Sequence, residues 1–290
     1  MLLFWYRVFY GFCWLLTLLP LRVLYLFSDI LFLIVCYIVR YRRKVVYENL
    51  RNSFPEKSEK ERRRIARKFY RFFCDLFIEI LKITNFSKAQ LNRRIHYTNP
   101  EIYEDLYKKG KQVFFIIGHY CNWEWLSALE GATPYHQASL YLPLRNKLFD
   151  KFFYDLRMKY GTEVIPTKNT VRYISKYLQE QRLTALCFLA DQSPHRDHIH
   201  HWVTFLNQDT PVFLGAEKLA KRYGMAIVYY ELRRVKRGYY EVEIIPVTEN
   251  AAETTEHEIT EKHVRLLEKT IRNNPQYWLW SHRRWKHKRS

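Results

Sequence analysis

Hydrophobic and polar positions divide the chain into an apolar N-terminal segment and a longer part in which short apolar runs alternate with amphipathic stretches. The first segment, residues 2–39, is almost continuously apolar and aromatic apart from a few charged residues and Pro20. We expect it to lie in or on a membrane. Residues 21–39 approach the length that crosses a bilayer, although Asp29 weakens them as a free-standing span. One span and two shorter buried helices both remain open, and a water-soluble pair of hydrophobic helices is the alternative to any membrane contact.

Basic residues follow this segment immediately, at Arg40, Arg42, Arg43 and Lys44. By the positive-inside rule they place the remainder of the chain in the cytoplasm. The apolar segment lacks the compact core and the small-residue cleavage site of a signal peptide. Beyond it we find no internal repeat and no Gly/Ser-rich linker. We therefore predict a membrane-anchoring segment at residues 1–44 and a single domain at residues 45–290.

The remainder of the chain predicts an α/β fold, because helical periodicity alternates with short buried strands. Predicted helices cover residues 47–83, 149–160, 218–222 and 256–272, and Ser58 opens the charge-rich helix within the first of these ranges. Predicted strands cover residues 113–117, 138–142, 183–189, 225–232 and 239–245.

The strongest candidate site follows the strand at residues 113–117. Gly118 ends that strand, His119 stands at its exit, and Asn122 is a plausible N-cap for the helix that carries Glu124. On one continuous helix, positions five apart would point about 140° away from each other. A strand, loop and helix can instead fold His119 back onto Glu124. The carboxylate would then hold the far nitrogen of a neutral imidazole, as a general base requires.

Two polar residues, Asp191 and Gln192, follow the strand at residues 183–189. Open α/β sheets bind their ligands beyond the carboxyl ends of buried strands, so these residues are candidate ligand contacts. A lone histidine near a strand end is usually structural, and the spacing His-x4-Glu arises often by chance. The apolar strand before His119 and the turn residues around it favour the catalytic interpretation.

Cysteine and histidine patterns point to packing rather than to chemistry. Cys121 lies between His119 and Glu124, but a thiol beside an aromatic cluster is more often inert than nucleophilic. The five cysteines form no CxxC pair, which favours a reducing compartment and no structural zinc. Clustered metal-ligand types occur at His195, Asp197, His198, His200 and His201. Their spacing matches no recognised ligand geometry, so we expect no metal site.

The charge balance indicates an anionic partner. Lys and Arg number 48 against 29 Asp and Glu, which gives a formal net charge of +19. Nucleic acid, a phospholipid surface and an acidic protein all fit this charge. The closing segment carries Trp280 and Trp285 among Arg283, Arg284 and Lys286. Interleaved Trp and Arg suit nucleic acid and the membrane interface equally.

Several stretches together resemble the bacterial lipid A late acyltransferases, the lauroyl and myristoyl acyltransferases of the lysophospholipid acyltransferase superfamily. They are His119-Tyr120-Cys121-Asn122-Trp123-Glu124, Tyr141-Leu142-Pro143 with Asn146, Arg157 to Gly161, Ala190-Asp191-Gln192, and Trp278-Leu279-Trp280-Ser281-His282-Arg283-Arg284-Trp285-Lys286. The His-x4-Asp/Glu motif is shared by the superfamily, and the closing segment points to this branch. The resemblance covers nearly the whole chain. It implies a glycerolipid-acyltransferase-like mixed sheet flanked by helices, with an N-terminal hydrophobic membrane helix segment.

The resemblance also implies roles for individual residues. His119 would be the base and Glu124 its partner, and Arg157 would lie near the substrate's phosphate or the developing oxyanion. Asp191 and Gln192 match the family's polar strand end. The chain departs from the family pattern at Leu142, where an Arg is frequent, and at Asn207, where a Gly is common. Arg145 would replace the missing charge.

As a member of this family, the protein would transfer a fatty acyl chain from acyl carrier protein to a hydroxyl of a lipid A precursor. Acyl-CoA is the other possible co-substrate. A thioester is already activated, so no further cofactor and no metal are expected. The partners would be acyl carrier protein, a phosphorylated lipid acceptor and an anionic membrane surface, and not nucleic acid. The catalytic domain would lie on the cytoplasmic face of the bacterial inner membrane.

Two alternatives to this function remain. One is acyl transfer to another membrane lipid, such as an aminolipid or a glycolipid. The other is a basic, membrane-tethered binding protein without chemistry, for which the charge balance and the aromatic-basic tail argue.

Overall fold

The apolar strand that precedes the candidate site lies in the middle of the main sheet. In the computed structural model, which describes residues 2–289, β2 (Val113–Ile117) lies between β5 (Thr184–Leu189) and β8 (Ala226–Lys236). Its bounds are those predicted from the sequence. All of its side chains are buried, as expected of a strand covered on both faces.

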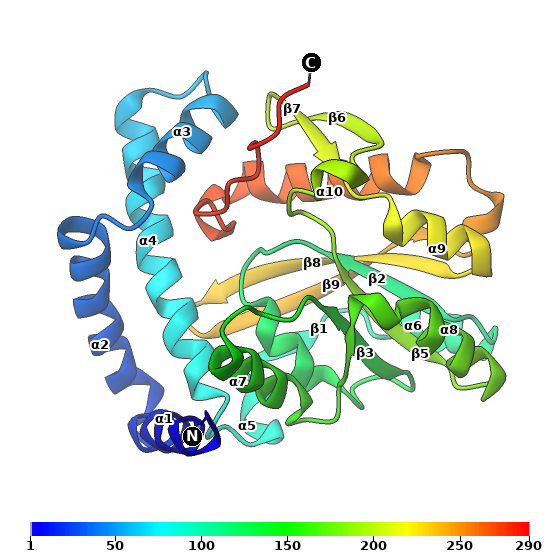
Figure 1. Ribbon diagram of the computed structural model, residues 1–290, viewed down its shortest axis with the longest axis horizontal. Coiled ribbons are helices and arrows are strands. Elements are labelled where there is room, and N and C mark those ends of the chain that lie inside the picture. Colours follow the sequence, from blue (N-terminus) through cyan, green and yellow to red (C-terminus); the bar gives the residue numbers. More distant parts are fainter. Residues whose placement is uncertain (1, 290) are drawn as a thin grey trace.

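The sheet is mixed, and its strand order is β1-β9-β8-β2-β5-β3-β4 (Figure 1). The remaining strands are β1 (Ile95–Tyr97), β3 (His136–Tyr141), β4 (Glu163–Pro166) and β9 (Tyr239–Thr248). Neighbouring strands are parallel except for the hairpin of β8 and β9, whose turn places Gly238 at a φ of 72°. A separate antiparallel pair is formed by β6 (His201–Phe205) and β7 (Gln208–Val212). The predicted mixed α/β fold is thus confirmed.

Helices cover both faces of the sheet. Their bounds are α3 (Arg43–Ser53), α4 (Glu59–Lys82), α5 (Lys88–Asn92), α6 (Glu101–Lys108), α7 (Lys147–Met158), α8 (Thr170–Gln179), α9 (Gly215–Tyr223) and α10 (Glu258–Asn273). On one face, Phe114 and Ile116 of β2 belong to a cluster with Ile174 of α8 and Ala220 of α9. The alternate β2 residue Phe115 belongs to the larger cluster on the other face. This alternation is the period of two expected of a strand.

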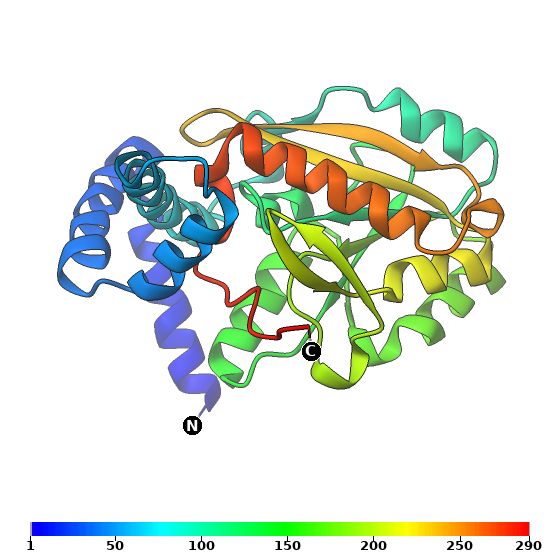
Figure 2. The same cartoon turned by 90° about the horizontal axis from the view of Figure 1, so that it is seen from above.

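The N-terminal segment forms α1 (Leu2–Leu16), α2 (Leu21–Leu33) and the π-helical turn η1 (Ile34–Ile38). By length and composition, residues 21–38 could cross a membrane, and 22% of this stretch is buried against the protein. Both helices lie at one end of the molecule, where α2 packs beside α4 (Figures 1 and 2). Ser58 caps α4 through a reciprocal capping box with Glu61, which confirms the predicted helix start.

The aromatic C-terminal segment is part of the core. After η6 (Pro275–Tyr277) the chain passes the end of β2, where Trp278 forms a bridge with Tyr120. Trp280 and Trp285 are buried, and so is Arg284. These three side chains pack inside the domain and form neither a nucleic-acid nor a membrane surface, whereas Arg283 and Lys286 of the same segment are exposed.

Candidate functional site

His119 and Asp191 come together because their strands are parallel neighbours. Ile117 of β2 pairs with Leu189 of β5, so the residues two positions beyond each strand end lie opposite each other. Gly118, which has no side chain, allows Asp191 and Leu267 to lie close to the backbone at the end of β2. A Cβ at this position would lie 3.3 Å from Oδ2 of Asp191 and 2.8 Å from Leu267. The sheet edge at which these strands end thus carries both residues.

Asp191 holds His119 by the backbone and by the ring. Its Oδ1 lies 2.6 Å from Nδ1 of His119, and its Oδ2 accepts hydrogen bonds at 2.8 Å from the backbone N–H of His119 and from Nε1 of Trp278. Burial alone would raise the pKa of Asp191. The charge of His119 and these hydrogen bonds outweigh burial and lower the pKa to about 2. Asp191 therefore stays ionised and fixes the proton of a neutral His119 on Nδ1.

The other ring nitrogen of His119 faces the open side of the site. Nε2 lies 3.0 Å from Nε2 of Gln192, an exposed side chain. With its proton on Nδ1, the imidazole offers Nε2 as an acceptor, and the Gln192 amide donates to it. The Trp123 ring lies edge-on to the imidazole at 4.9 Å between centroids. The arrangement presents the basic nitrogen of His119 where an incoming hydroxyl could replace the amide.

The expected contact between His119 and Glu124 is not the one that forms. Among the described residues, the Glu124 carboxylate accepts hydrogen bonds from Nε and Nη2 of Arg157, at 2.8 and 2.6 Å, and from Nε1 of Trp123, at 3.2 Å. Asn122 caps the 3-10 helix η2 (Trp123–Leu129), as predicted, and this helix turns Glu124 toward α7. Asp191, and not Glu124, is the partner of Nδ1.

Glu124 and Arg157 form a buried ion pair beside the site. Burial would raise the pKa of Glu124, but the charge and hydrogen bonds of Arg157 outweigh it and lower the pKa. Burial would lower the pKa of Arg157, and Glu124 raises it in turn. The bidentate geometry is the strong form of such a pair. Both residues line a narrow cavity together with Trp123, Ser139 and Cys187, among others.

The remaining sequence-predicted residues lie farther from this centre. Arg145 is exposed in the loop that connects β3 to α7. Cys121 is buried, and burial raises the pKa of its thiol well above the ordinary value, as expected of an inert cysteine. The histidine-rich segment pairs with carboxylates individually, His195 with Asp197 and His201 with Glu261.

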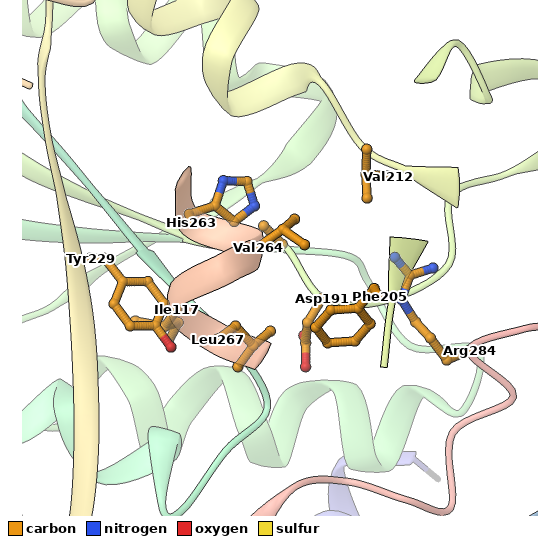
Figure 3. Close-up of a pocket in the computed structure, with 10 residues that line it drawn as sticks. Ile117, Asp191, Phe205, Val212, Tyr229, His263, Val264, Leu267 and Arg284 are labelled. Atoms are coloured by element: carbon orange, nitrogen blue, oxygen red, sulfur yellow. The ribbon is translucent and has the colours of Figure 1, made fainter. Parts of the chain in front are cut away.

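Sequence reasoning missed the residues that pack behind Asp191. Trp278 hydrogen-bonds its carboxylate, and a second cavity beyond it is lined by Ile117, Phe205, His263 and Arg284 (Figure 3). Nη2 of Arg284 donates to the Pro211 carbonyl at 2.8 Å, and burial lowers the pKa of the guanidinium to about 10. His119 and Asp191 each lie two residues beyond the end of their strands. If the strand order had been known, this equal spacing could have predicted that they meet. Trp278 stood out only as part of the closing segment, and no local signal connected it with Asp191.

Comparison with known proteins decides the family. A model described as bacterial lipid A biosynthesis acyltransferase matches residues 2–287. The chain belongs to this family. The resemblance seen in the sequence is thereby confirmed.

Similar proteins carry names from the same family. The chain is 23% identical over 207 residues to a lipid A biosynthesis acyltransferase of Haemophilus influenzae, and the match covers 68% of this chain and 62% of that relative's length. It is 18% identical over 242 residues to lipid A biosynthesis acyltransferase 2 of Shigella flexneri, covering 80% of this chain and 74% of that relative.

Proposed function

We propose that this protein transfers a fatty acyl chain from an acyl carrier protein thioester to a hydroxyl of a lipid A precursor. Membership of the lipid A biosynthesis acyltransferase family supports acyl transfer in lipid A synthesis. The single observation that carries the chemistry is the 2.6 Å contact between Nδ1 of His119 and Asp191, because it leaves Nε2 as the base.

The reaction begins when the acceptor hydroxyl displaces the Gln192 amide from Nε2 of His119. Nε2 removes the hydroxyl proton as the oxygen attacks the thioester carbonyl. Asp191 stabilises the imidazolium that forms and keeps the ring in position. The tetrahedral intermediate then collapses, the carbon–sulfur bond breaks, and the leaving thiolate takes the proton from Nε2. The products are the new ester and the thiol of the carrier, and His119 is again neutral.

The developing oxyanion needs a donor, and Arg157 of α7, which lines a cavity together with Trp123 and Glu124, is the candidate cation. Glu124 uses Nε and Nη2 of Arg157, and Nη1 has no hydrogen-bond partner among the described residues. We assign Nη1 to the oxyanion and Glu124 to the orientation of the guanidinium. Glu124 therefore acts through Arg157 rather than on His119.

The surface charge supports the choice of partners. A net charge of +19 favours both an acidic carrier protein and a phosphorylated acceptor lipid. Arg145, exposed at the loop before α7, is a candidate contact for such a phosphate. The place of action would be the cytoplasmic face of the bacterial inner membrane, which the basic residues 40–44 after the apolar helices favour. Acyl-CoA as donor, or another lipid as acceptor, would use the same centre.

The binding protein without chemistry is the weaker candidate. It rested on the charge balance and on the aromatic-basic tail, and Trp280, Arg284 and Trp285 of that tail are buried.

The test is acyl transfer by the purified protein with acyl carrier protein thioester and a lipid A precursor in mixed micelles. His119→Ala is expected to lower turnover by about three orders of magnitude, since it removes a general base. His96→Ala on β1, whose side chain is exposed, is the matched control and should retain parental activity. Near-parental transfer by His119→Ala would overturn the mechanism.

A further inference from the structure

The apolar helix α2 is attached along its length to the catalytic part of the chain. Side chains of α4 make hydrogen bonds, at several points along the helix, with residues of α2 and of the chain just before and after it. From one end to the other, Lys82 donates to the Leu19 carbonyl at 2.9 Å, Tyr25 to Glu79 at 2.7 Å, Ser28 to Asp75 at 2.8 Å, Arg71 to Asp29 at 3.1 Å, and Tyr70 to the Tyr41 carbonyl at 2.7 Å. The helix therefore runs beside the domain and does not project from it (Figure 1).

The ion pairs of Asp29 bear on whether α2 could cross a membrane. It lies in the middle of the apolar stretch and pairs both with Arg71 of α4 and with Arg237 of the β8–β9 turn. The side chain of Arg71 is 58% exposed. If α2 stood across a bilayer, this guanidinium and the adjoining parts of the sheet would lie at the depth of the hydrocarbon. A charged side chain at that depth is strongly disfavoured, and exposed polar backbone beside it is disfavoured as well.

The opposite side of the two N-terminal helices is apolar and exposed. The exposed positions of α1 are Leu3, Phe4, Trp5, Val8, Phe12, Trp14 and Leu15, and those of α2 and η1 are Val23, Leu26, Phe27, Ile30, Leu33, Ile34, Tyr37 and Ile38. We call these residues the outer face. Exposed cations lie at both ends of α2, at Arg22 and at Arg40. An apolar face with cations at its margins is typical of helices that lie in the membrane interface.

The outer face continues onto the loop that leads from β3 to α7. Just after this loop, Phe149 in the first turn of α7 contacts α1, where Phe9 lies edge-on to it at 5.7 Å between ring centroids. Leu142 in this loop is 75% exposed and Leu144 is 42% exposed, with Arg145 beside them. The strand β2, which delivers His119, is parallel to β8, and the arrowhead of β8 points toward α4 (Figure 1). The carboxyl end of β2, which carries His119, therefore faces the side of the molecule on which α4 lies, and α2 packs beside α4.

We propose that α1 and α2 lie in the plane of the membrane, with the outer face and the loop at residues 142–146 inserted into one leaflet, and that α2 does not cross the bilayer. The partner is a lipid leaflet with anionic headgroups, which the cations at the helix ends would contact. The orientation is independent of the acyl-transfer proposal, since it rests on contacts outside the site.

The test measures the depth of α2 at three points. Val23→Cys, Ile30→Cys and Ile38→Cys are each labelled with an environment-sensitive fluorophore, and the protein is bound to vesicles of phosphatidylethanolamine and phosphatidylglycerol. Lipids that carry a spin label at a shallow or a deep position then quench the fluorophore. Val171→Cys on α8, 44% exposed, is the control expected to escape quenching, and the parent chain gives the background from its own thiols.

An in-plane orientation predicts the same shallow depth at Val23 and Ile30 of α2 and at Ile38 of η1, together with shallow quenching of Leu142→Cys. A spanning helix predicts that Ile30 lies near the bilayer centre while Val23 and Ile38 lie near opposite surfaces, and this result would overturn the proposal. Absence of quenching at all three positions would overturn it as well, because it would remove the membrane contact. Neither result depends on turnover, so failure here is distinct from failure of the catalytic mechanism.

Discussion

Asp191 accepts hydrogen bonds from both the backbone N–H and the ring Nδ1 of His119, at 2.8 and 2.6 Å, although the two residues are 72 positions apart. Two contacts to one residue fix both the position and the tautomer of the imidazole. Glu124, five positions from His119, instead pairs with Arg157. The two carboxylates of the site therefore have different tasks, and substitution separates them.

Replacement of Asp191 by Asn is expected to lower turnover by about three to four orders of magnitude, since an amide favours the wrong imidazole tautomer. The substitution preserves size and should leave the fold intact. Steady-state kinetics with saturating thioester give the effect, and circular dichroism checks the fold. A loss of less than tenfold would show that Asp191 does not support the base.

Arg157→Met should destabilise the protein by about 3–5 kcal/mol, because it leaves the buried Glu124 carboxylate without its cation. Glu124→Gln combined with Arg157→Met removes both charges and should recover part of this loss. Thermal melting of the parent, both single variants and the double variant completes a double-mutant cycle. Additive losses would mean that the pair contributes no coupling to stability.

Stability is expected to fall as the pH drops from about 6.5 toward 4, through His263. Burial lowers the pKa of His263 from 6.5 to about 4. The unfolded chain therefore binds a proton at a higher pH than the folded chain does, so acid favours unfolding, by about 2 kcal/mol at pH 5. His263→Phe should flatten the dependence of the melting temperature on pH across this range. An unchanged pH profile in the variant would contradict the assignment.

Glu79→Gln should weaken the attachment of both α2 and the loop that carries Asn122. The Glu79 carboxylate accepts hydrogen bonds from Tyr25 of α2 and Tyr240 of β9 at 2.7 Å, and from Asn122 at 2.8 Å. The amide has one acceptor oxygen in place of two, so at least one buried donor loses its partner at a cost of about 1–3 kcal/mol.

Limited proteolysis should then cleave faster at the turn between α1 and α2, and turnover should fall with it. Glu48→Gln, an exposed substitution on α3, is the matched control and should match the parent in both measurements. Cleavage of Glu79→Gln at the parental rate would argue against a role for Glu79 in holding α2.

From the sequence, His119, Glu124 and Asp191 were all candidate site residues, but His119 was paired with Glu124, whereas in the structure it contacts Asp191. The bounds of β2, the exit of His119 and the polar pair at Asp191 followed from local patterns, because a buried strand and its breaker are encoded in adjacent residues. Which carboxylate meets His119 depends on β5 lying beside β2, with Ile117 level with Leu189. Strand order and register are set by packing between distant segments, so the sequence alone did not contain the choice.

Short elements escaped prediction for a related reason. The three residues of β1 (Ile95–Tyr97) carry too little periodicity to be recognised, and they become a strand because they pair with β9. The strand expected at 138–142 begins at His136, since that end is fixed by pairing with Thr184 of β5. The closing Trp-rich segment was interpreted by composition, whereas its burial depends on the space left between β2, β6 and β7.

The chain of contacts from Tyr25 through Glu79 to Asn122 has a practical consequence for anyone who wants a water-soluble version of this protein. Deleting the first two helices would strip partners from Asp75 and Glu79 and expose the packed side of α4. The better design keeps both helices and exchanges the outward residues, such as Phe4, Leu26 and Ile30, for Glu, Lys and Gln. Such a variant would retain the inner contacts and lose its affinity for detergent.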